Sequence, residues 1–486
     1  MGIRTPDWVK DAVFYQIFPD RFARSDQVCK PENLEPWDAP PTHRGFKGGD
    51  FIGMLEHLDY LVDLGVSAIY FNPIFQSAAN HRYHTHDYYR VDPILGGDSA
   101  FEAFLTRAHQ EGIRVVLDGV FNHASRGFLQ FNHIMENGTK SPYIDWFIVN
   151  GFPLRAYDDR HSPNYAAWWN NRELPKLNTD NPQVREFLIG VAEYWLHQGI
   201  DGWRLDVPLE ITTPGFWEEF RERVKGINPD AYILAEIWHD ADQWLQGDHF
   251  DAVMNYGFNR ACYGFFGGPW LDVSARPGGY KLERLDGVKF GREVARLANL
   301  YDPEVTLAQY NLLSSHDEPR FLTMVRGDVR RLRLATLFQM TYVGVPSVYY
   351  GDEIGMMGGP DPDCRRAFPW DERHWDLSLR ADFQRFIALR RAHPALRRGS
   401  FTPLHAEETL YAFARSYEQE VVIVVLNGGD APKEVVLDLS EVLDRSGHGV
   451  ELSEAWGEGK VQFESGKLRV TVPVLDGRVF VARRSL

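Results

Sequence analysis

The chain has 486 residues, of which 44% are hydrophobic and 25% charged, and this composition excludes disordered, collagen-like and coiled-coil proteins. Its formal net charge of −16 repels polyanions, so we expect neither nucleic acid nor an anionic membrane as a partner. The 3 cysteines exclude a disulfide framework. The first residues lack the apolar core of a signal peptide, and no apolar run approaches ~18 residues, so we expect a cytoplasmic protein without a membrane span.

Short β-branched or aromatic runs alternate with segments of helical periodicity along most of the chain. Such alternation is typical of βα units with parallel strands. The strand candidates are residues 12–18, 67–72, 113–120, 200–207, 231–237, 250–255, 310–316 and 346–353. They favour an α/β fold, a (β/α)8 TIM barrel, and an open doubly wound sheet is the alternative.

The positions of four acidic residues favour the barrel over the open sheet. Each lies at the carboxyl end of a different strand candidate: Asp118, Asp206, Glu236 and Asp317. A barrel brings all of its strand ends to one mouth, whereas an open sheet would keep ends so distant in strand order apart. We therefore predict a barrel with these carboxylates at its mouth.

Two segments depart from the βα alternation. Residues 124–180 are irregular and aromatic-rich, and from about residue 399 short strands with turn residues replace the helical pattern. We assign residues 1–123 and 181–398 to the barrel (domain A), 124–180 to an inserted domain B, and 399–486 to a C-terminal antiparallel β-sandwich (domain C). We expect the aromatic residues of domain B to line one side of the mouth, namely Tyr143, Trp146, Tyr165, Trp168 and Trp169.

The strand candidate at 200–207 ends in an arginine and an aspartate. Arg204 and Asp206 are two residues apart, so on a strand they point to the same face. An adjacent guanidinium lowers a carboxyl pKa, whereas the apolar residues before Glu236 raise its pKa. A low-pKa and a raised-pKa carboxyl about 5–5.5 Å apart are the pair of a retaining glycoside hydrolase. The alternative is a structural Arg–Asp pair together with a helix-capping acid.

Four sequence blocks occur in a fixed order: DGVFNH at 118–123, DGWRLDV at 201–207, EIWHD at 236–240 and SSHDEPR at 314–320. They resemble the blocks that mark strands three, four, five and seven in the α-amylase family of glycoside hydrolases. Three shorter segments resemble the neopullulanase, cyclomaltodextrinase and maltogenic amylase group: LPKLN, VMNY and the run that follows Glu236. The first strand candidate begins by about Ala12, so we expect the chain to lack the N-terminal β domain through which that group dimerises. Its oligomeric state is left open.

The resemblance implies a role for each matching residue. Asp206 becomes the nucleophile, Glu236 the general acid/base and Asp317 the third carboxylate, which stabilises the transition state. Residues expected to bind sugars at and beside the cleavage site are Tyr83, His123, Arg204, Trp238, His316, Asp361 and Arg365. Among these, Tyr83 would stack beneath the sugar and Trp238 would contact sugars on the leaving-group side.

Some of the polar loop residues are also candidate metal ligands. The sequence HRYHTHD at 81–87 is similar to a dinuclear zinc-binding motif, but Tyr88 occupies the position of the last histidine of that motif. Related enzymes bind calcium in the first βα loop, where Asp26 and Asp50 are the candidates, although Arg24 replaces an expected ligand. Two solvated loop acids are the alternative there. The calcium position beside domain B is expected to be absent, because Leu209–Glu210 replaces its histidine. We expect no required cofactor, with structural calcium possible.

The resemblance implies a retaining hydrolase of α-1,4-glucosidic bonds, with activity on α-1,6 bonds also possible. The expected substrates are maltooligosaccharides, cyclodextrins, pullulan or starch, with some transglycosylation. The alternatives on the same fold are an α-glucan transglycosylase, an α-glucosidase and a glucan-binding protein without catalysis.

Overall fold

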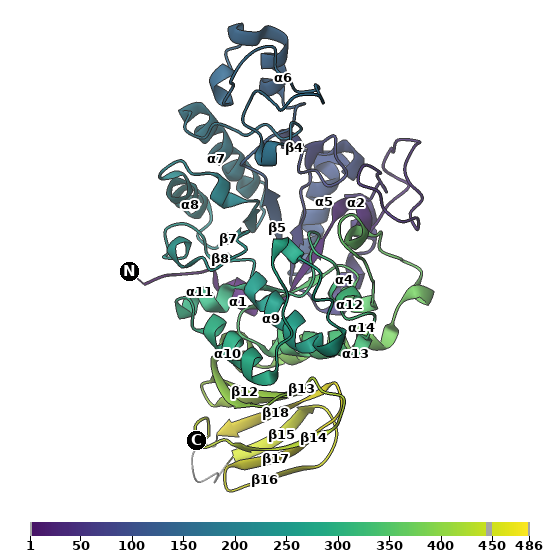
Figure 1. Ribbon diagram of the computed structural model, residues 1–486, viewed down its shortest axis with the longest axis vertical. Helices are drawn as coiled ribbons and strands as arrows, with labels where there is room; N and C mark the ends of the chain where they lie inside the picture. Colours follow the sequence, from purple (N-terminus) through teal and green to yellow (C-terminus); the bar gives the residue numbers. More distant parts are fainter. Residues whose placement is uncertain (1, 444–449, 485–486) are drawn as a thin grey trace.

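The computed structural model describes residues 2–443 and 450–484, and its centre is a barrel of parallel strands (Figure 1). The strand order is β8-β7-β6-β5-β2-β1-β10-β9, and a parallel bridge between Met254 and Tyr310 connects the two ends of this sheet. The strands are β1 (Phe14–Ile17), β2 (Ala68–Phe71), β5 (Arg114–Gly119), β6 (Gly202–Leu205), β7 (Tyr232–Ala235), β8 (Ala252–Val253), β9 (Tyr310–Leu312) and β10 (Val345–Tyr349). The predicted TIM barrel is confirmed, and the open sheet is excluded.

The barrel strands are buried on both faces, which is why they read as continuous apolar runs. Successive side chains alternate between the barrel interior and the surrounding helices. Phe14, Tyr70 and Leu234 belong to the interior cluster, whereas Ile69 and Ile233 belong to the cluster outside the strands.

Helices surround the barrel, and several begin at a polar cap. Asn181 accepts from the backbone N–H of Gln183 at the start of α7, and Asp286 and Asp376 cap α10 and α14 in the same way. The helices are α1 (Asp7–Asp11), α2 (Pro19–Phe22), α3 (Phe51–Glu56), α4 (Leu58–Leu64), α5 (Gly97–Gln110), α6 (Leu129–Asn137), α7 (Pro182–His197), α8 (Phe216–Ile227), α9 (Tyr256–Phe266), α10 (Gly287–Ala298), α11 (Pro303–Ala308), α12 (Phe321–Met324), α13 (Val329–Thr341), α14 (Leu377–Ala392) and α15 (Pro394–Arg398).

A hairpin that the sequence pattern did not reveal follows β2. It consists of β3 (Phe75–Ser77) and β4 (Thr85–Val91), paired antiparallel with register shifts. The loop between its strands carries Tyr83 and the histidines of the HRYHTHD word. The shifted register explains why no clean period-two pattern marks these strands.

Domain B contains α6 and short bridges rather than a regular sheet, and it lies at the upper end of the molecule in Figure 1. Its own core includes Phe131, Phe147 and Tyr165. Trp146 and Tyr165 are only 7% and 3% exposed, so the expectation that they line the mouth is wrong. Both side chains pack in the apolar core instead.

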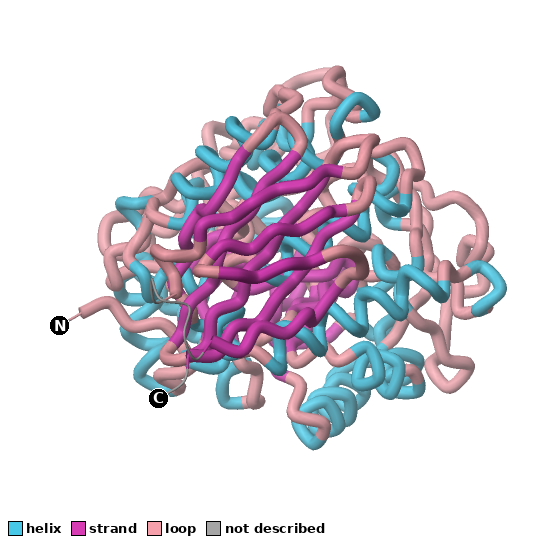
Figure 2. The backbone as a smooth tube through the Cα atoms, turned by 90° about the horizontal axis from the view of Figure 1, so that it is seen from below, coloured by secondary structure: helices cyan, strands magenta, loops and turns pink. Residues whose placement is uncertain are grey.

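Domain C packs two antiparallel sheets against each other and confirms the predicted C-terminal sandwich; its strands face the viewer in Figure 2. Alternate residues of β12 face in opposite directions: Ala412 belongs to the sandwich core and Phe413 to the core shared with the barrel. The strands are β11 (Ser400–Ala406), β12 (Leu410–Tyr417), β13 (Glu420–Asn427), β14 (Lys433–Asp438), β15 (Val450–Trp456), β16 (Val461–Glu464), β17 (Lys467–Val472) and β18 (Asp476–Arg484).

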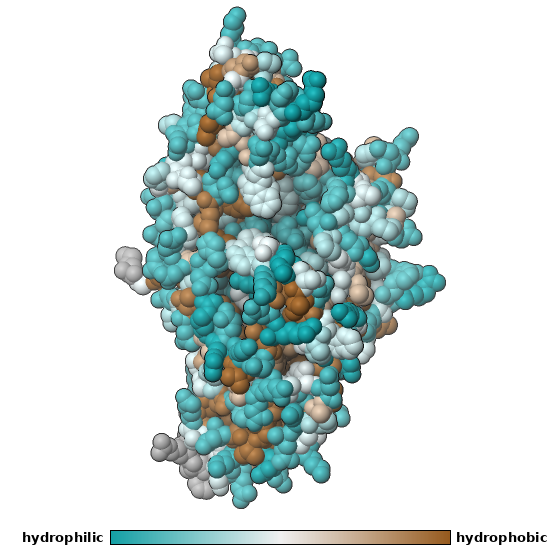
Figure 3. All heavy atoms as spheres, in the orientation of Figure 1, coloured by the Kyte–Doolittle hydropathy of each residue, from teal (hydrophilic) through white to brown (hydrophobic). Residues whose placement is uncertain are grey.

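No helix in the described part of the chain is both long and apolar enough to cross a bilayer. In Figure 3 the visible face is mostly hydrophilic, and its apolar residues are scattered among polar ones, most of them in the lower half.

Candidate active site

Charged residues gather at the carboxyl ends of β5, β6 and β7. Asp118 of β5 lies in register with Arg204 of β6, and β6 pairs with β7 as its next neighbour. Asp206 and Glu236 directly follow the last residues of β6 and β7. Because these strands are parallel, the four side chains meet at one rim of the barrel.

Arg204 is the central cation of this group and is fully buried. Its Nη1 donates to Oδ1 of Asp118 at 2.9 Å and to Oδ1 of Asp206 at 3.0 Å. Its Nη2 lies 3.0 Å from Oε2 of Glu236. One guanidinium therefore holds Asp206 and Glu236 side by side and fixes their orientation.

The backbone after Asp206 is strained. Val207 has φ 36° and ψ 50°, a left-handed conformation that is unfavourable for a β-branched residue. Its N–H donates to Oε2 of Glu236 at 3.0 Å. Strain of this kind costs on the order of 1–3 kcal/mol and persists where surrounding contacts enforce it. Here it supplies a second donor that holds Glu236 in place.

Burial raises the pKa of both carboxyl groups in the pair. Glu236 raises the pKa of Asp206 further, and Arg204 lowers it without offsetting the burial. The expectation that Arg204 holds the pKa of Asp206 low is therefore wrong, because desolvation outweighs one shared guanidinium. The pKa of Glu236 is raised as predicted, mainly by burial. Because both carboxyls are desolvated and Glu236 raises the pKa of Asp206, the pair retains one proton more easily than it loses both.

Asp317 lies beyond β9, with its side chain 29% exposed. Its Oδ2 is 3.1 Å from Nε2 of His316, and its Oδ1 is 3.4 Å from Nη2 of Arg365. Arg365 also donates to the backbone oxygen of His316 at 2.7 Å and pairs with Oδ1 of Asp361 at 3.0 Å. Arg365 therefore links the third carboxylate to the more exposed Asp361.

Tyr83 connects the hairpin loop to the rim. Its hydroxyl donates to Oδ2 of Asp118 at 2.8 Å and accepts from Nδ2 of Asn72 at 3.1 Å. The Tyr83 ring is stacked on His316, with centroids 5.6 Å apart and 9° between planes. The same hydroxyl lies 2.7 Å from Nε2 of His316.

Gln16 of β1 fixes the tautomer of His316. Its Nε2 donates to Nδ1 of His316 at 2.9 Å, so the ring proton lies on Nε2, facing Tyr83 and Asp317. Burial lowers the pKa of His316 well below its ordinary value. His316 is therefore a neutral hydrogen-bond donor at the site.

His123 begins a row of stacked rings that leads to the surface. Trp168 stacks on His123 with centroids 5.4 Å apart, and Trp169 stacks on Trp168 at 4.9 Å. Trp169 is 82% exposed and has a positive φ of 49°. Burial lowers the pKa of His123 to about 3. The imidazole of His123 is therefore neutral, and its buried Nε2 is left without a hydrogen-bond partner among the described residues.

Trp238 contacts the proposed acid directly. Its Nε1 donates to Oε1 of Glu236 at 3.1 Å, and its indole stacks on Tyr256 with centroids 3.6 Å apart. Gly278 packs against the indole: a Cβ there would lie 2.1 Å from Cζ3 of Trp238. Trp238 therefore orients Glu236 as well as presenting an aromatic surface.

The sequence places Asp118 at the barrel mouth but gives it no role, and it does not identify Tyr70 as a site residue. Asp118 holds Arg204 and Tyr83, and Tyr70 donates to its Oδ2 at 2.6 Å. The first position of DGVFNH was the signal for Asp118. Tyr70 carried no such signal, because a tyrosine in a buried strand looks like core until its hydroxyl partner is known.

The predicted metal candidates do not assemble a site. In the described part of the chain, no group of three or more His, Cys, Asp and Glu side chains could hold a metal ion, and this includes the histidines at 81–86. Asp26 is exposed, whereas Asp50 is fully buried and its Oδ2 lies 2.9 Å from Nζ of Lys30. Asp50 is therefore not a solvated loop acid, because its buried carboxylate is paired with Lys30.

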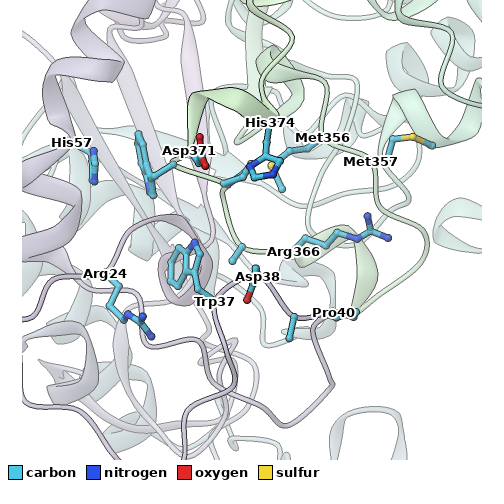
Figure 4. A pocket seen from close by; sticks show the side chains of 14 residues that line it. Arg24, Trp37, Asp38, Pro40, His57, Met356, Met357, Arg366, Asp371 and His374 are labelled. Carbon is cyan, nitrogen blue, oxygen red and sulfur yellow. The ribbon is translucent and has the colours of Figure 1, made fainter.

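A separate cavity of about 850 Å³ lies between the loops that follow β1 and β10 (Figure 4). Trp37, Asp38, Arg366, Trp370 and His374 are among its lining residues, and none of the predicted catalytic residues lines it. The indole N–H groups of Trp37 and Trp370 donate to backbone oxygens at 2.8 and 2.7 Å. These two indoles brace the loops around the cavity.

Comparison with known proteins agrees with this geometry. The family description "Alpha amylase, catalytic domain" matches residues 16–378, and "Maltogenic Amylase, C-terminal domain" matches residues 401–478. A cyclomaltodextrinase from Bacillus sp is 45% identical over 431 residues, which are 88% of this chain and 74% of that protein. Neopullulanase 2 from Thermoactinomyces vulgaris is 43% identical over 479 residues, 98% of this chain and 78% of that protein.

Among solved structures, the debranching enzyme from Nostoc punctiforme superimposes with a TM-score of 0.90 at 46% identity, covering 99% of this chain and 100% of that one. The matched catalytic domain spans the barrel rim with its carboxylates, and the matched C-terminal domain spans most of domain C. The chain therefore belongs to the α-amylase family of glycoside hydrolases, in the group of neopullulanases, cyclomaltodextrinases and maltogenic amylases.

Proposed function

We propose that this enzyme hydrolyses α-glucosidic bonds by double displacement with retention of configuration. The observation that carries the proposal is the single guanidinium of Arg204, within 3.0 Å of both Asp206 and Glu236. Two carboxyls paired with one guanidinium lie side by side, which supports the short carboxyl separation of a retaining mechanism over the wider one of an inverting mechanism.

In the first step, protonated Glu236 donates its proton to the glycosidic oxygen while a carboxylate oxygen of Asp206 bonds to the anomeric carbon. The glycosidic bond breaks, the leaving sugar departs with the proton, and a glycosyl ester of Asp206 remains. In the second step, ionised Glu236 takes a proton from water, whose oxygen attacks the anomeric carbon and releases Asp206. A sugar hydroxyl in place of water gives transglycosylation by the same step.

The residues around the pair suit a transition state with positive charge at the anomeric carbon. Asp317 supplies negative charge and accepts from sugar hydroxyls. Tyr83 offers a ring face held by His316 and Asp118. The buried Nε2 of His123, which has no partner among the described residues, is the group that we propose to bond a sugar hydroxyl. Trp238, stacked on the buried Tyr256, forms the aromatic surface beside Glu236, on the side proposed for the leaving sugar.

We propose maltooligosaccharides and cyclodextrins as the principal substrates, with α-1,4 bonds as the main target. The names of the cyclomaltodextrinase and neopullulanase relatives support this choice. Cleavage of α-1,6 bonds is the second candidate activity, and the similarity to the Nostoc punctiforme debranching enzyme over the whole chain favours it. A cytoplasmic location is part of the proposal, since a Bacillus subtilis relative 37% identical over 468 residues is named an intracellular maltogenic amylase.

A parallel substrate panel tests the proposal. Initial rates and products are compared on β-cyclodextrin, maltotriose, pullulan, soluble starch and sucrose. We expect a higher kcat/KM on β-cyclodextrin and maltotriose than on starch, with panose or maltose from pullulan and no activity on sucrose. A preference for starch with random internal cleavage would contradict the substrate choice. Pullulan converted to maltotriose alone would assign the enzyme to α-1,6 bonds.

Two isosteric variants test the roles of the carboxyls. Asp206→Asn should abolish turnover, and Glu236→Gln should lower kcat by about 10²–10⁴-fold. The loss in Glu236→Gln should be smaller on α-glucosyl fluoride, because fluoride leaves without a proton. Equal losses on both substrates would contradict the acid role of Glu236. Circular dichroism of both variants serves as the folding control.

A further inference from the structure

The loop after β1 is long, and its interior is built around lysine ammonium groups. It runs over residues 23–50 from α2 to α3, and its turn at Trp37–Pro40 forms one wall of the cavity in Figure 4. A loop of this length without helix or strand needs internal polar contacts to hold one conformation. Two of its lysines provide such contacts.

Lys47 is fully buried and lies among oxygen atoms. Its Nζ donates to the backbone oxygens of Pro36 and Ala39 at 2.6 and 2.7 Å and lies 3.5 Å from Oε2 of Glu35. Two carbonyl oxygens and a carboxylate are the ligand types that a hard cation such as calcium takes. The ammonium group is the cation at this position.

Lys30 makes the same kind of contact at the base of the loop. Its Nζ lies 2.9 Å from Oδ2 of Asp50 and donates to the backbone oxygen of Ile94. Asp50 is fully buried and also accepts from the N–H groups of Ser25 and Gly53 at 2.9 and 2.8 Å. Lys30 therefore connects the first βα loop to the chain just after the hairpin that carries Tyr83.

Asp50 is also the residue for which the family resemblance suggests calcium. Its carboxylate already has one cation, and Lys30 is its only ion-pair partner among the described residues. A divalent ion beside the ammonium group would meet like-charge repulsion in a buried setting, where it is weakly screened. The residues present therefore fit a lysine and not a calcium ion.

We propose that Lys30 and Lys47 perform in the first βα loop the structural role of a bound calcium ion, so that the fold and activity of this enzyme are independent of calcium. Each ammonium group pairs with a carboxylate and donates to backbone oxygen, Lys30 to that of Ile94 and Lys47 to those of Pro36 and Ala39, as a coordinated ion would bind them. Removing either side chain leaves an oxygen-lined, negatively charged hole of the kind that binds calcium.

The test measures the melting temperature (Tm) and the rate on maltotriose with EDTA, with calcium chloride, and with sodium chloride at matched ionic strength. We expect the wild type to give the same Tm and rate in all three. Lys30→Ala and Lys47→Ala should each lower Tm by roughly 5 °C, because a buried charge loses its partner. Millimolar calcium should restore at least half of that loss, whereas sodium chloride should not.

Lys225→Ala is the matched control. Lys225 also donates to a backbone oxygen, that of Ala231, at 2.7 Å and to a buried carboxylate, that of Asp251, at 2.8 Å. Asp251 keeps a second cation, Arg221, at 2.9 Å, so calcium should not restore the Tm of this variant. A wild type that loses Tm in EDTA and regains it with calcium would overturn the proposal. The proposal would also be overturned if calcium raised the Tm of Lys30→Ala and Lys47→Ala no more than that of Lys225→Ala. The measurement on the wild type tests calcium independence even if a variant fails to fold.

Discussion

Replacing Trp238 by phenylalanine removes one hydrogen-bond donor from Glu236 and keeps an aromatic ring on Tyr256. The Nε1–H of Trp238 donates to Oε1 of Glu236 at 3.1 Å and so favours the ionised carboxylate. A hydrogen bond to a charged group is worth about 1.5–3 kcal/mol, and one pKa unit corresponds to about 1.4 kcal/mol. The pKa of Glu236 should therefore rise by about 1–2 units in Trp238→Phe.

The rise should be visible in the pH dependence of kcat/KM on maltotriose. The alkaline limb reports loss of the proton from the general acid in the free enzyme, so it should move to higher pH by the same amount, about 1–2 units. Trp370→Phe is the control, because its indole donates to a backbone oxygen away from the catalytic carboxylates and its limb should not move. An unmoved limb in Trp238→Phe, or a shift to lower pH, would refute the positioning of Glu236 by Trp238.

Four further substitutions probe other parts of the site. Tyr83→Phe removes the hydroxyl between Asp118 and His316 and should lower kcat/KM on maltotriose about 10–100-fold with a small change in Tm, the equivalent of one or two hydrogen bonds. Burial raises the pKa of Glu318 to about 8. Between about pH 4.5 and 8 only the native state retains this proton, so the stability of the protein falls as pH rises through this range. Glu318→Gln should therefore raise Tm at neutral pH and lose this advantage near about pH 4. Trp169→Ala should raise KM for maltoheptaose more than for maltotriose without lowering Tm, because the indole is 82% exposed. Val207→Gly should keep the N–H bond to Glu236, relieve the positive φ, and leave kcat within about threefold and Tm unchanged or higher.

The barrel could be predicted because its strands are buried on both sides and its helices carry a clear apolar period. The strand at 310–316 was predicted too long: β9 ends at Leu312, and the chain then turns to place His316 and Asp317 at the rim. The β3–β4 hairpin was missed because its register shifts break the alternating pattern. Apolar periodicity identifies the strands and helices that pack in the core, but it does not reveal a short hairpin whose side chains do not alternate regularly between apolar and polar.

The charged residues of the candidate site could be predicted, because they lie in sequence motifs at the ends of strands. Asp206, Glu236 and Arg204 come together because neighbouring parallel strands end at the same rim. The pKa direction of Asp206 could not be predicted, because it depends on how deeply the pair is buried and on Arg204 being shared among three carboxylates. The pairing of Asp50 with Lys30 could not be predicted either. No helix or strand fixes the distance between these two residues, so their contact depends on the conformation of the irregular loop.

The anomeric configuration of the first product tests the central claim most directly. Proton NMR spectra recorded during the first seconds to minutes of maltotriose hydrolysis, before mutarotation, distinguish the α from the β anomer at the new reducing end. Double displacement through Asp206 with Glu236 as acid/base predicts the α anomer as the initial product. An initial β anomer would mean a single displacement by water and would contradict the assignment of Asp206 as nucleophile.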